Sequence, residues 1–163
     1  MRVCIFGAGA IGGFLAPGLA QVDGVELSIL ARGDHLNAIL EKGIALVRDR
    51  EATVFPVARG SADPAELGEQ DVVFNCLKSH QAWQSAENML PLLGKDTAVV
   101  TCQNGVPWWY FHKIGGEFEG KRMDAVARGD RQWNAIGPER AIGCSVYPAT
   151  EISAPGVITH IHG

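Results

Sequence analysis

Three glycines near the beginning of the chain have a spacing that suits phosphate binding. Gly7, Gly9 and Gly12 form the pattern G-x-G-x-x-G between the apolar run Val3–Phe6 and a segment with helical spacing, Ile11–Val22. In such a strand-turn-helix unit the first glycine allows a sharp turn, the second lets a pyrophosphate approach the backbone, and the third lets the helix pack against the sheet. Amide groups at the helix start and the helix dipole favour the phosphate charge. The pattern predicts dinucleotide binding, with a purely structural glycine-rich turn as the alternative.

A basic residue occupies the position that distinguishes the two nicotinamide dinucleotides. The alternating run Val25–Leu30 is expected to form the second strand, and Arg32 follows its end, 20 residues after Gly12. A carboxylate at this position binds the ribose 2′-hydroxyl of NAD, whereas an arginine accommodates the 2′-phosphate of NADP. Asp34 is interpreted as the N-cap of the next helix. Arg32 therefore favours NADPH as the cofactor, with a solvated surface charge as the alternative.

Two further polar residues follow strands that are expected to be buried. Lys78 comes after the apolar run Asp71–Leu77, and Asn104 comes after Thr97–Cys102. In open parallel sheets, ligands bind outside the carboxyl ends of the strands. We therefore expect Lys78 and Asn104 in one crevice, where the Asn104 amide could bridge cofactor and substrate. The alternatives are an ordinary exposed lysine and a turn residue before glycine.

The elements that must position these residues alternate between strand and helix. A helix is expected over His35–Lys42 with Gly43 as its stop, then a small hairpin of Ile44–Arg48 and Thr53–Val57, and a short helix over 63–67. A longer helix, capped by Ser79 and ended by Gly94, should follow the strand before Lys78. The predicted fold class is α/β, a Rossmann-type three-layer domain with helices on both faces of a mostly parallel sheet.

The last third of the chain departs from this alternation. Trp108–Phe111 is an aromatic cluster too dense for one helix face, so part of it is expected to contact something beyond the sheet. The run Glu117–Arg131 is interpreted as loop with short strands. The β-like runs Ala141–Tyr147 and Gly156–Ile161 should pair with each other or extend the main sheet, which adds antiparallel strands to it.

Composition limits the class of protein. The chain has 163 residues, 47% hydrophobic and 20% charged, which suits one soluble domain with a core. A net charge of −4 with scattered Lys and Arg argues against a nucleic-acid surface. No apolar run reaches the roughly 18 to 20 residues of a membrane span, and no signal-peptide pattern opens the chain, so a cytoplasmic protein without a membrane partner is expected.

Cysteine and histidine residues give no metal or disulfide signature. The four cysteines lie in apolar, strand-like runs without a C-x-x-C pair and are interpreted as buried, reduced thiols: Cys4, Cys76, Cys102 and Cys144. His160 and His162 alternate as metal ligands can, but no third ligand accompanies them. We therefore predict no metal site.

Taken together, these motifs resemble the N-terminal, NADPH-binding domain of the ketopantoate reductase family (2-dehydropantoate 2-reductases). The matching segments are G-A-G-A-I-G at 7–12, A-R-G at 31–33, Lys78, Q-N-G at 103–105, and the later G-C-S-V-Y-P-A and P-G-V-I-T-H-I-H-G runs. The resemblance covers essentially the whole chain, so residues 1–163 are expected to form one NADP-binding domain.

The resemblance implies a reductase that passes hydride from NADPH to the ketone of a 2-keto acid, such as 2-dehydropantoate, to give pantoate or a related hydroxy acid. By analogy the pyrophosphate is held by the loop residues Gly7, Ala8, Gly9, Ala10, Ile11 and Gly12. Arg32 would bind the 2′-phosphate, and Lys78 and Asn104 the nicotinamide side. Asn104 would also be catalytic, because it lies near the substrate. These groups orient the reactive carbon and stabilise the developing alkoxide.

In the family, the general acid is a lysine on a helical C-terminal domain that also supplies most of the substrate pocket. The chain stops at Gly163, before any such domain, and none of its own lysines is expected to replace that residue. We therefore expect it to need that domain or a partner chain, with a homodimer as one option. Two alternatives remain open: a stand-alone NADP(H)-binding module or subunit without turnover, and a related two-domain hydroxyacid dehydrogenase.

Overall fold

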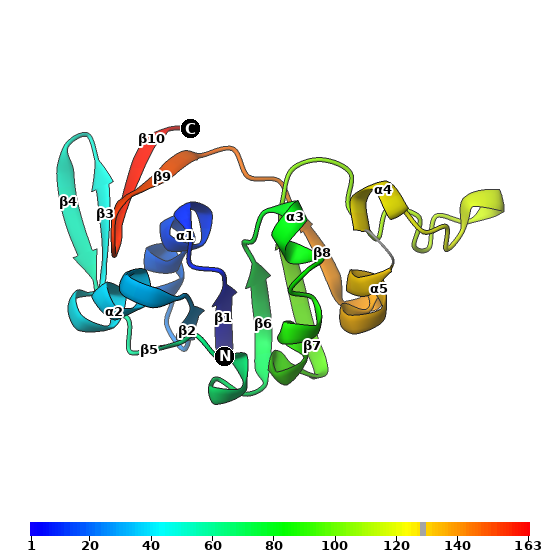
Figure 1. Cartoon of the computed structure of the whole chain (residues 1–163), viewed down its shortest axis with the longest axis horizontal. Helices are drawn as coiled ribbons and strands as arrows, with labels where there is room; N and C mark the ends of the chain where they lie inside the picture. The colour runs from blue at the N-terminus through cyan, green and yellow to red at the C-terminus, as the bar shows by residue number, and fades with distance from the viewer. Residues whose placement is uncertain (128–129) are drawn as a thin grey trace.

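The computed structural model describes residues 1–127 and 130–163, which form a twisted main sheet and a smaller second sheet (Figure 1). All six strands of the main sheet are parallel, in the order β5-β2-β1-β6-β7-β8. They are β1 (Arg2–Phe6), β2 (Glu26–Leu30), β5 (Arg59–Ser61), β6 (Gln70–Asn75), β7 (Leu93–Cys102) and β8 (Ala141–Cys144). The direction of connection reverses between β1 and β6, so this is the switch point where ligands bind in open α/β sheets.

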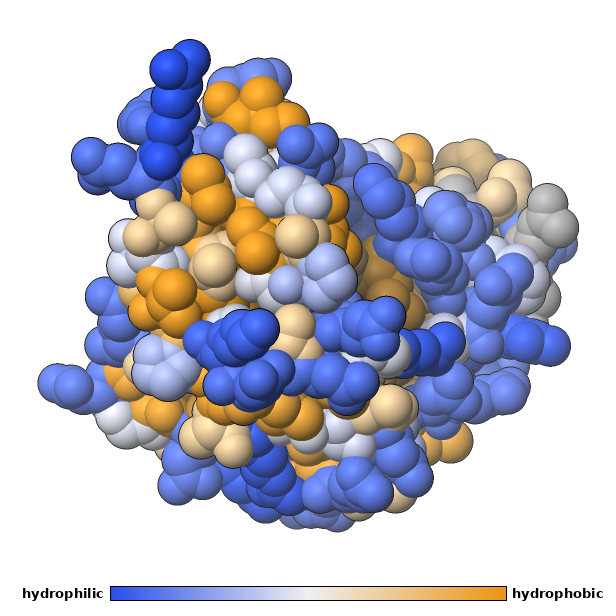
Figure 2. Space-filling view, turned by 60° about the vertical axis from the view of Figure 1, so that its left-hand side comes forward, coloured by the Kyte–Doolittle hydropathy of each residue, from blue (hydrophilic) through white to orange (hydrophobic). Residues whose placement is uncertain are grey.

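The second sheet has the order β4-β3-β10-β9. Its strands are β3 (Ile44–Arg48), β4 (Glu51–Phe55), β9 (Ala149–Ala154) and β10 (Val157–His162). The predicted hairpin is confirmed as β3 and β4, which turn through Asp49 and Arg50 at φ 50° and 69°. On the side of the molecule that carries this sheet, Figure 2 shows apolar groups at the surface between polar ones.

The α/β class with a mostly parallel sheet is therefore confirmed, with one difference in the final strands. β8 extends the main sheet in the parallel direction, whereas β10 runs parallel to β3 and antiparallel to β9 in the second sheet. Strand β9 was not expected from the sequence. Figure 1 shows the chain crossing from β8 at one edge of the main sheet back to β9 on the other side of the molecule.

The helices are shorter and more varied than the sequence indicates. The α-helices are α1 (Ala10–Ala20), α2 (Gly33–Lys42), α3 (Ser79–Ala82), α4 (Asp124–Ala127) and α5 (Arg131–Ile136). The 3-10 helices are η1 (Pro64–Glu66), η2 (Glu87–Leu92), η3 (Gly116–Phe118) and η4 (Pro138–Arg140). Within the described residues, no helix has the length and apolar character needed to cross a bilayer.

Three local predictions are corrected. The single helix expected after Ser79 is divided into α3 and η2, and Gly94, its expected stop, lies inside β7. Pro91 lies within η2, where it has no amide to continue an α-helical ladder. Asp34 is not the N-cap of α2: Gly33, at φ 55°, already begins the helix, and Arg32 is the capping residue without a side-chain bond. The region 117–131 holds η3, α4 and the start of α5 instead of strands, with 128–129 outside the described residues.

Helix α1 lies between the two sheets. A Cβ atom on Gly12 would overlap the Gly7 carbonyl oxygen and come within 2.7 Å of Ile5 Cγ2 on β1. On the other side, a Cβ on Gly13 would come within 2.7 Å of Ile158 Cδ1 on β10. Side chains could not occupy either gap, so the two glycines let the helix touch both sheets. The core around it contains Ile5, Ala8, Ala16, Ile29, Ala31, Leu36, Ile39, Ile44, Leu46 and Ile158.

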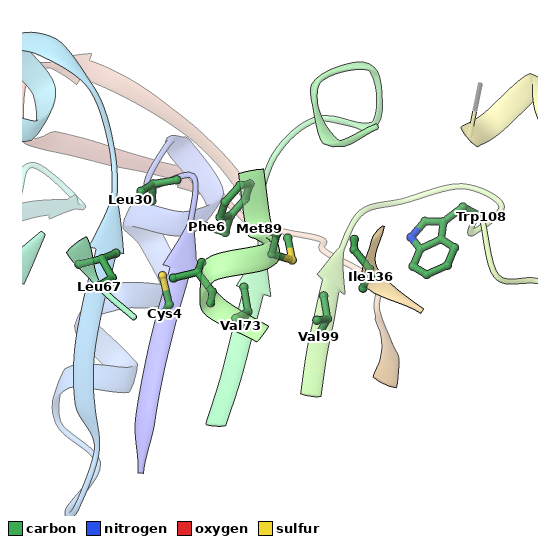
Figure 3. Packing of buried hydrophobic residues seen from close by; sticks show 10 residues of the cluster. Cys4, Phe6, Leu30, Leu67, Val73, Met89, Val99, Trp108 and Ile136 are labelled. Atoms are coloured by element: carbon green, nitrogen blue, oxygen red, sulfur yellow. The ribbon is translucent and has the colours of Figure 1, made fainter. Parts of the chain in front are cut away.

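A second core fills the opposite face of the main sheet, beneath η2 and α5 (Figure 3). Its buried residues are Cys4, Phe6, Leu30, Leu67, Val73, Met89, Leu92, Val99, Trp108 and Ile136. Trp108, expected in an aromatic cluster that reaches beyond the sheet, is thus part of the core at 2% exposure. Tyr110, two residues on, is half exposed, so the aromatic run divides between core and surface.

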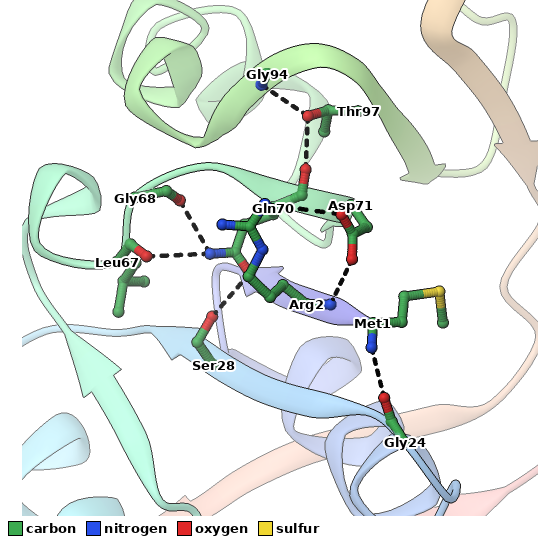
Figure 4. Close-up of polar contacts among 10 residues, drawn as sticks. All are labelled: Met1, Arg2, Gly24, Ser28, Leu67, Gly68, Gln70, Asp71, Gly94 and Thr97. Atoms are coloured by element: carbon green, nitrogen blue, oxygen red, sulfur yellow. Dashed lines mark hydrogen bonds and ion pairs between the residues drawn. The ribbon is translucent and has the colours of Figure 1, made fainter.

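Polar side chains tie together the amino-terminal edge of the main sheet (Figure 4). The buried amide of Gln70 donates to the carbonyls of Leu67 and Gly68 at 3.2 and 2.9 Å, and its Oε1 accepts from Ser28 at 3.4 Å. Thr97 Oγ1 donates to the Gln70 carbonyl at 2.6 Å. These internal hydrogen bonds satisfy the buried polar groups at this end of the sheet.

Candidate functional site

A cleft runs along the carboxyl ends of four neighbouring strands. Arg32 follows β2, Gly7 follows β1, Lys78 lies beyond the end of β6, and Asn104 lies beyond β7. Two adjoining pockets of about 430 and 820 Å³ form the cleft, the first with Arg32 in its wall and the second with Lys78 and Asn104. Gly7 and Gly9 line both pockets. The fold thus brings the polar residues singled out in the sequence to one continuous depression.

Each glycine of the opening motif has a different surrounding. Gly7 has φ 95°, and a Cβ there would lie 2.5 Å from Leu77 Cδ2, so both the turn and the close packing require glycine. Gly9 has no heavy atom within 4 Å of its hypothetical Cβ and faces open space. Gly12 packs against β1. The glycine loop is therefore closely packed against the rest of the protein at Gly7 and Gly12 and open to solvent at Gly9. This arrangement fits the approach of a pyrophosphate.

The beginning of α1 offers free backbone donors. The first turn of a helix leaves its amide groups without intrahelical partners, and no side chain caps this helix. Within that turn lie Ala10, Ile11 and Gly12. Ala8 differs, because its amide donates to the Leu30 carbonyl at 2.9 Å. The donors available to an anion are thus those at the helix start, while Ala8 fixes the shape of the loop.

His35 supports the glycine loop, a role that no motif in the sequence indicates. Its Nε2 lies 2.8 Å from the Ala8 carbonyl oxygen, and its Nδ1 accepts a hydrogen bond from the Gly156 amide at 3.0 Å. A ring that accepts at Nδ1 and donates at Nε2 is the neutral Nε2–H tautomer. His35 therefore joins the loop after β1 to the turn between β9 and β10.

The ends of β6 and β7 are linked through Gln103. Its Nε2 donates to the Leu77 carbonyl at 2.7 Å, immediately before Lys78. Lys78 is exposed, and no ion pair within the described ranges involves it. The ammonium group is therefore available to a ligand, while its backbone is held in place by the neighbouring loop.

Asn104 is oriented by two hydrogen bonds to one residue. Its Nδ2 donates to the Val146 carbonyl at 2.8 Å, and its Oδ1 accepts from the Val146 amide at 2.9 Å. An amide nitrogen has two hydrogens, so one N–H remains to donate to a ligand. Val146 belongs to the crossing segment 145–148 between β8 and β9, part of which lines the cleft. The last third of the chain thus supplies one wall of the site and fixes Asn104.

Comparison with known proteins agrees with this geometry. A family model described as ketopantoate reductase PanE/ApbA matches residues 3–108. The chain belongs to this family. A 2-dehydropantoate 2-reductase from Mesorhizobium japonicum is 52% identical over all 163 residues, which are 50% of that protein. One from Pyrococcus horikoshii is 30% identical over 106 residues, 65% of this chain and 34% of that protein.

Solved structures of the ketopantoate reductase family share the fold. A protein from Ralstonia solanacearum MolK2, assigned provisionally as a ketopantoate reductase, has a TM-score of 0.87 at 39% identity, covering 99% of this chain and 50% of that one. A 2-dehydropantoate 2-reductase from Porphyromonas gingivalis W83 has a TM-score of 0.77 at 25% identity, covering 98% and 51%. The chain spans about half the length of the relatives it matches.

In this member of the ketopantoate reductase family, three cysteines form a row at the carboxyl ends of β6, β7 and β8. Cys102 pairs with Cys144 across β7 and β8, and Cys76 directly follows β6. The Cys76 thiol donates to the Cys102 sulfur, which lowers the pKa of Cys102 and raises that of Cys76. Burial raises the pKa of Cys144, and burial raises that of Cys4, away from the row, to about 12. All four are free, with Cys76 and Cys144 only partly buried.

His160, near the end of this family member, contacts an aromatic ring and a backbone carbonyl. The His160 ring lies 5.1 Å from the Phe14 ring, centroid to centroid, and its Nε2 lies 3.1 Å from the Gly163 carbonyl oxygen. In residues 1–127 and 130–163, no group of three or more His, Cys, Asp and Glu side chains could hold a metal ion.

Proposed function

We propose that this chain forms the cofactor-binding half of an NADPH-dependent reductase of 2-keto acids, with 2-dehydropantoate or a related compound as substrate. The observation that carries the proposal is the continuous cleft from Arg32, past the open face of Gly9, to Lys78 and Asn104. Its position at the switch point of the sheet is the usual place for a dinucleotide. Family membership supports the same assignment.

The pyrophosphate would lie at the start of α1. The loop from Gly7 to Gly12 surrounds it, with Gly9 leaving room and the amides of Ala10, Ile11 and Gly12 donating. Ala8 contributes by holding the loop in shape through its bonds to Leu30 and His35. The positive end of the helix dipole adds attraction for the phosphate charge.

Arg32 would bind the 2′-phosphate of NADPH. It is exposed, stands at the end of β2 and lines the same pocket as the glycine loop. A guanidinium can bind a phosphate through two parallel hydrogen bonds, which NADH cannot accept because it lacks that group. Preference for NADPH over NADH is the expected consequence.

At the other end of the cleft, Lys78 and Asn104 would hold the nicotinamide side and the keto acid. The cofactor, when bound, supplies a hydride to the substrate ketone. The free N–H of Asn104 would donate to the oxygen that gains charge as the ketone becomes an alkoxide, and the Lys78 ammonium would attract negative charge nearby. We assign no residue of this chain as the general acid, and we propose that a helical domain or partner chain supplies that lysine.

A fluorescence titration with NADPH and NADH tests the proposal. Tighter binding of NADPH is expected, and Arg32→Asp should remove the preference by weakening NADPH binding about 10-fold or more. Arg50→Asp, in the exposed β3–β4 turn, is a control that changes charge by the same amount. Equal or absent binding of both cofactors would contradict the assignment. Preferential binding of NADPH without turnover on ketopantoate would favour a binding module or a subunit.

A further inference from the structure

The three cysteines of the row occupy matching positions on neighbouring strands. Cys102 of β7 is directly paired with Cys144 of β8, and Cys76 follows the last pair of β6 with β7, Asn75 with Thr101. Directly paired residues of parallel strands point to the same face of the sheet, with a strand spacing of about 4.7–4.9 Å. A disulfide needs Cα atoms roughly 4.4–6.8 Å apart, so the backbone positions of Cys102 and Cys144 suit one.

The Cys102 sulfur contacts both of its neighbours in the row. It accepts hydrogen bonds from the thiols of Cys76 and Cys144, and these donors lower its pKa. A lower pKa gives more of the thiolate, which is the form of cysteine that attacks an oxidised sulfur. Cys102 is therefore placed to react with an adjacent cysteine that has been oxidised.

Solvent reaches this pair of cysteines through two pockets. Cys144 is only partly buried and lines a pocket of about 350 Å³, whereas Cys102, at 4% exposure, lines one of about 260 Å³. Strand β8 is the last of the main sheet, so Cys144 lies on an edge that can shift, while Cys76 follows a strand inside the sheet (Figure 1). Cys144 is therefore the first of the row to meet an oxidant, and Cys102 is its directly paired partner.

The same two strands lead into one wall of the cleft. Asn104 comes two residues after Cys102, and Val146 comes two residues after Cys144. Two hydrogen bonds, of 2.8 and 2.9 Å, join Asn104 to Val146. A disulfide would bring the two sulfurs from hydrogen-bond contact to about 2.05 Å, so the end of β8 must move relative to β7. Such a movement acts on the segment that holds Asn104 in place.

We propose that Cys102 and Cys144 form a reversible disulfide when a peroxide oxidises the protein, and that this cross-link weakens cofactor binding by displacing Val146 from Asn104. The disulfide site is independent of the proposed function. Only the effect on the cofactor rests on that function, because Asn104 and Val146 line the pocket assigned to the nicotinamide side.

The reaction has two steps. The Cys144 thiolate attacks one oxygen of the peroxide, the O–O bond breaks, and the other oxygen leaves as hydroxide, which gives a sulfenic acid on Cys144. The Cys102 thiolate then attacks that sulfur, the S–S bond forms as the S–O bond breaks, and a second hydroxide leaves. The two thiols lose two electrons and two protons in total, and hydrogen peroxide is reduced to two molecules of water.

Peptide mapping and a cofactor titration test the proposal. The chain is treated with hydrogen peroxide, freed of peroxide, blocked with iodoacetamide in denaturant and digested without reductant. We expect one peptide pair joined through Cys102 and Cys144, which dithiothreitol separates. The oxidised chain should bind NADPH about fivefold more weakly than the reduced chain, and reduction should restore the affinity.

Matched variants identify the pair. Cys144→Ser and Cys102→Ser should each abolish both the cross-link and the change in NADPH affinity caused by peroxide. Cys4→Ser, at a buried cysteine outside the row, should keep both. Cys76→Ser should also keep the cross-link, because Cys76 is not one of the two bonded residues.

Other products of oxidation would overturn the assignment. These are a bond between Cys76 and Cys102, a disulfide between two copies of the chain on a non-reducing gel, and a sulfinic acid on Cys144 without a cross-link. If the expected bond forms and NADPH affinity stays the same, the effect on the cleft is refuted and the disulfide site stands. If the reduced chain does not bind NADPH, the proposed function fails, and peptide mapping still decides the disulfide.

Discussion

The amide of Gly156 donates a hydrogen bond to Nδ1 of His35 at 3.0 Å, across 121 positions of the sequence. The other ring nitrogen of His35 reaches the carbonyl of Ala8 in the glycine loop. The second sheet is therefore coupled to the loop that we assign to the pyrophosphate. The second sheet therefore does more than cover α1, because it holds His35, which supports the glycine loop.

Replacing His35 should loosen the glycine loop. His35→Ala leaves the Ala8 carbonyl and the Gly156 amide without their partner, and we expect the free energy of unfolding to fall by about 1–2 kcal/mol. NADPH affinity should fall with it. Denaturant unfolding and cofactor titration measure both quantities, and His162→Ala, at an exposed position, is the matched control. Unchanged stability and affinity would show that the bridge is unimportant.

Two glycine-to-alanine changes should separate stability from cofactor binding. Gly9→Ala meets no atom within 4 Å and has a backbone φ of −75°, so the fold should keep its stability to within about 0.5 kcal/mol. The added methyl group occupies the approach of the pyrophosphate, so NADPH binding should be lost. Gly12→Ala collides with the Gly7 carbonyl and should destabilise the fold by about 1–3 kcal/mol. Equal unfolding curves for both variants would refute this distinction.

Asn104→Ala should detach the crossing segment 145–148 from the cleft. The variant removes both the donor to the Val146 carbonyl and the acceptor of the Val146 amide. Amide hydrogen exchange at Val146 should become faster, and NADPH binding should weaken. Asn37→Ala, on the exposed surface of α2, is the matched control. Slow exchange retained in the Asn104 variant would mean that other contacts fix this segment.

The Gln70 network predicts a stability effect far from the cleft. Gln70→Ala leaves the Leu67 and Gly68 carbonyls without their side-chain donor, while the Ser28 hydroxyl keeps its bond to the Val3 carbonyl, so the free energy of unfolding should fall by about 2–3 kcal/mol. Glu69→Ala, next to it but exposed, should change stability by less than about 0.5 kcal/mol. NADPH affinity should be retained at temperatures where the variant is folded.

Thiol labelling should distinguish Cys4 from the row in the cleft. Burial raises the pKa of Cys4 to about 12, so at about pH 8 it stays protonated, and it is also inaccessible. Iodoacetamide should therefore leave it unmodified until the chain unfolds. The bond from Cys76 lowers the pKa of Cys102, but Cys102 is only 4% exposed, so labelling of the row should begin at the partly buried Cys144.

Bound NADPH should slow labelling of Cys76, because Cys76 lines the pocket assigned to the nicotinamide side. Mass spectrometry of the labelled peptides gives the rate at each site. Labelling of Cys4 in the native state would contradict its burial, and a Cys76 rate unaffected by saturating NADPH would contradict the placement of the cofactor.

Local sequence alone determined the opening unit and the hairpin. The strand ending at Phe6, the turn at Gly7 and the helix after Gly9 depend on neighbouring residues, and glycine is required there by φ and close packing. The polar residues after the buried strands were found for the same reason, since parallel strands place their carboxyl ends at one edge. The end of helix α2 at Gly43 and the turn after Asn104 likewise depend only on local backbone conformation.

Tertiary structure decided the features that join distant segments. The partner of β10 is β3, the hydrogen bonds of Asn104 go to Val146, and His35 contacts Gly156, and none of these has a signal in the spacing of apolar residues. Gly94, expected as a helix stop, instead lies in β7, which is paired with the distant strand β6. A sequence pattern reports which face of an element is apolar, whereas the choice of its partner depends on contacts made only once the whole chain has folded.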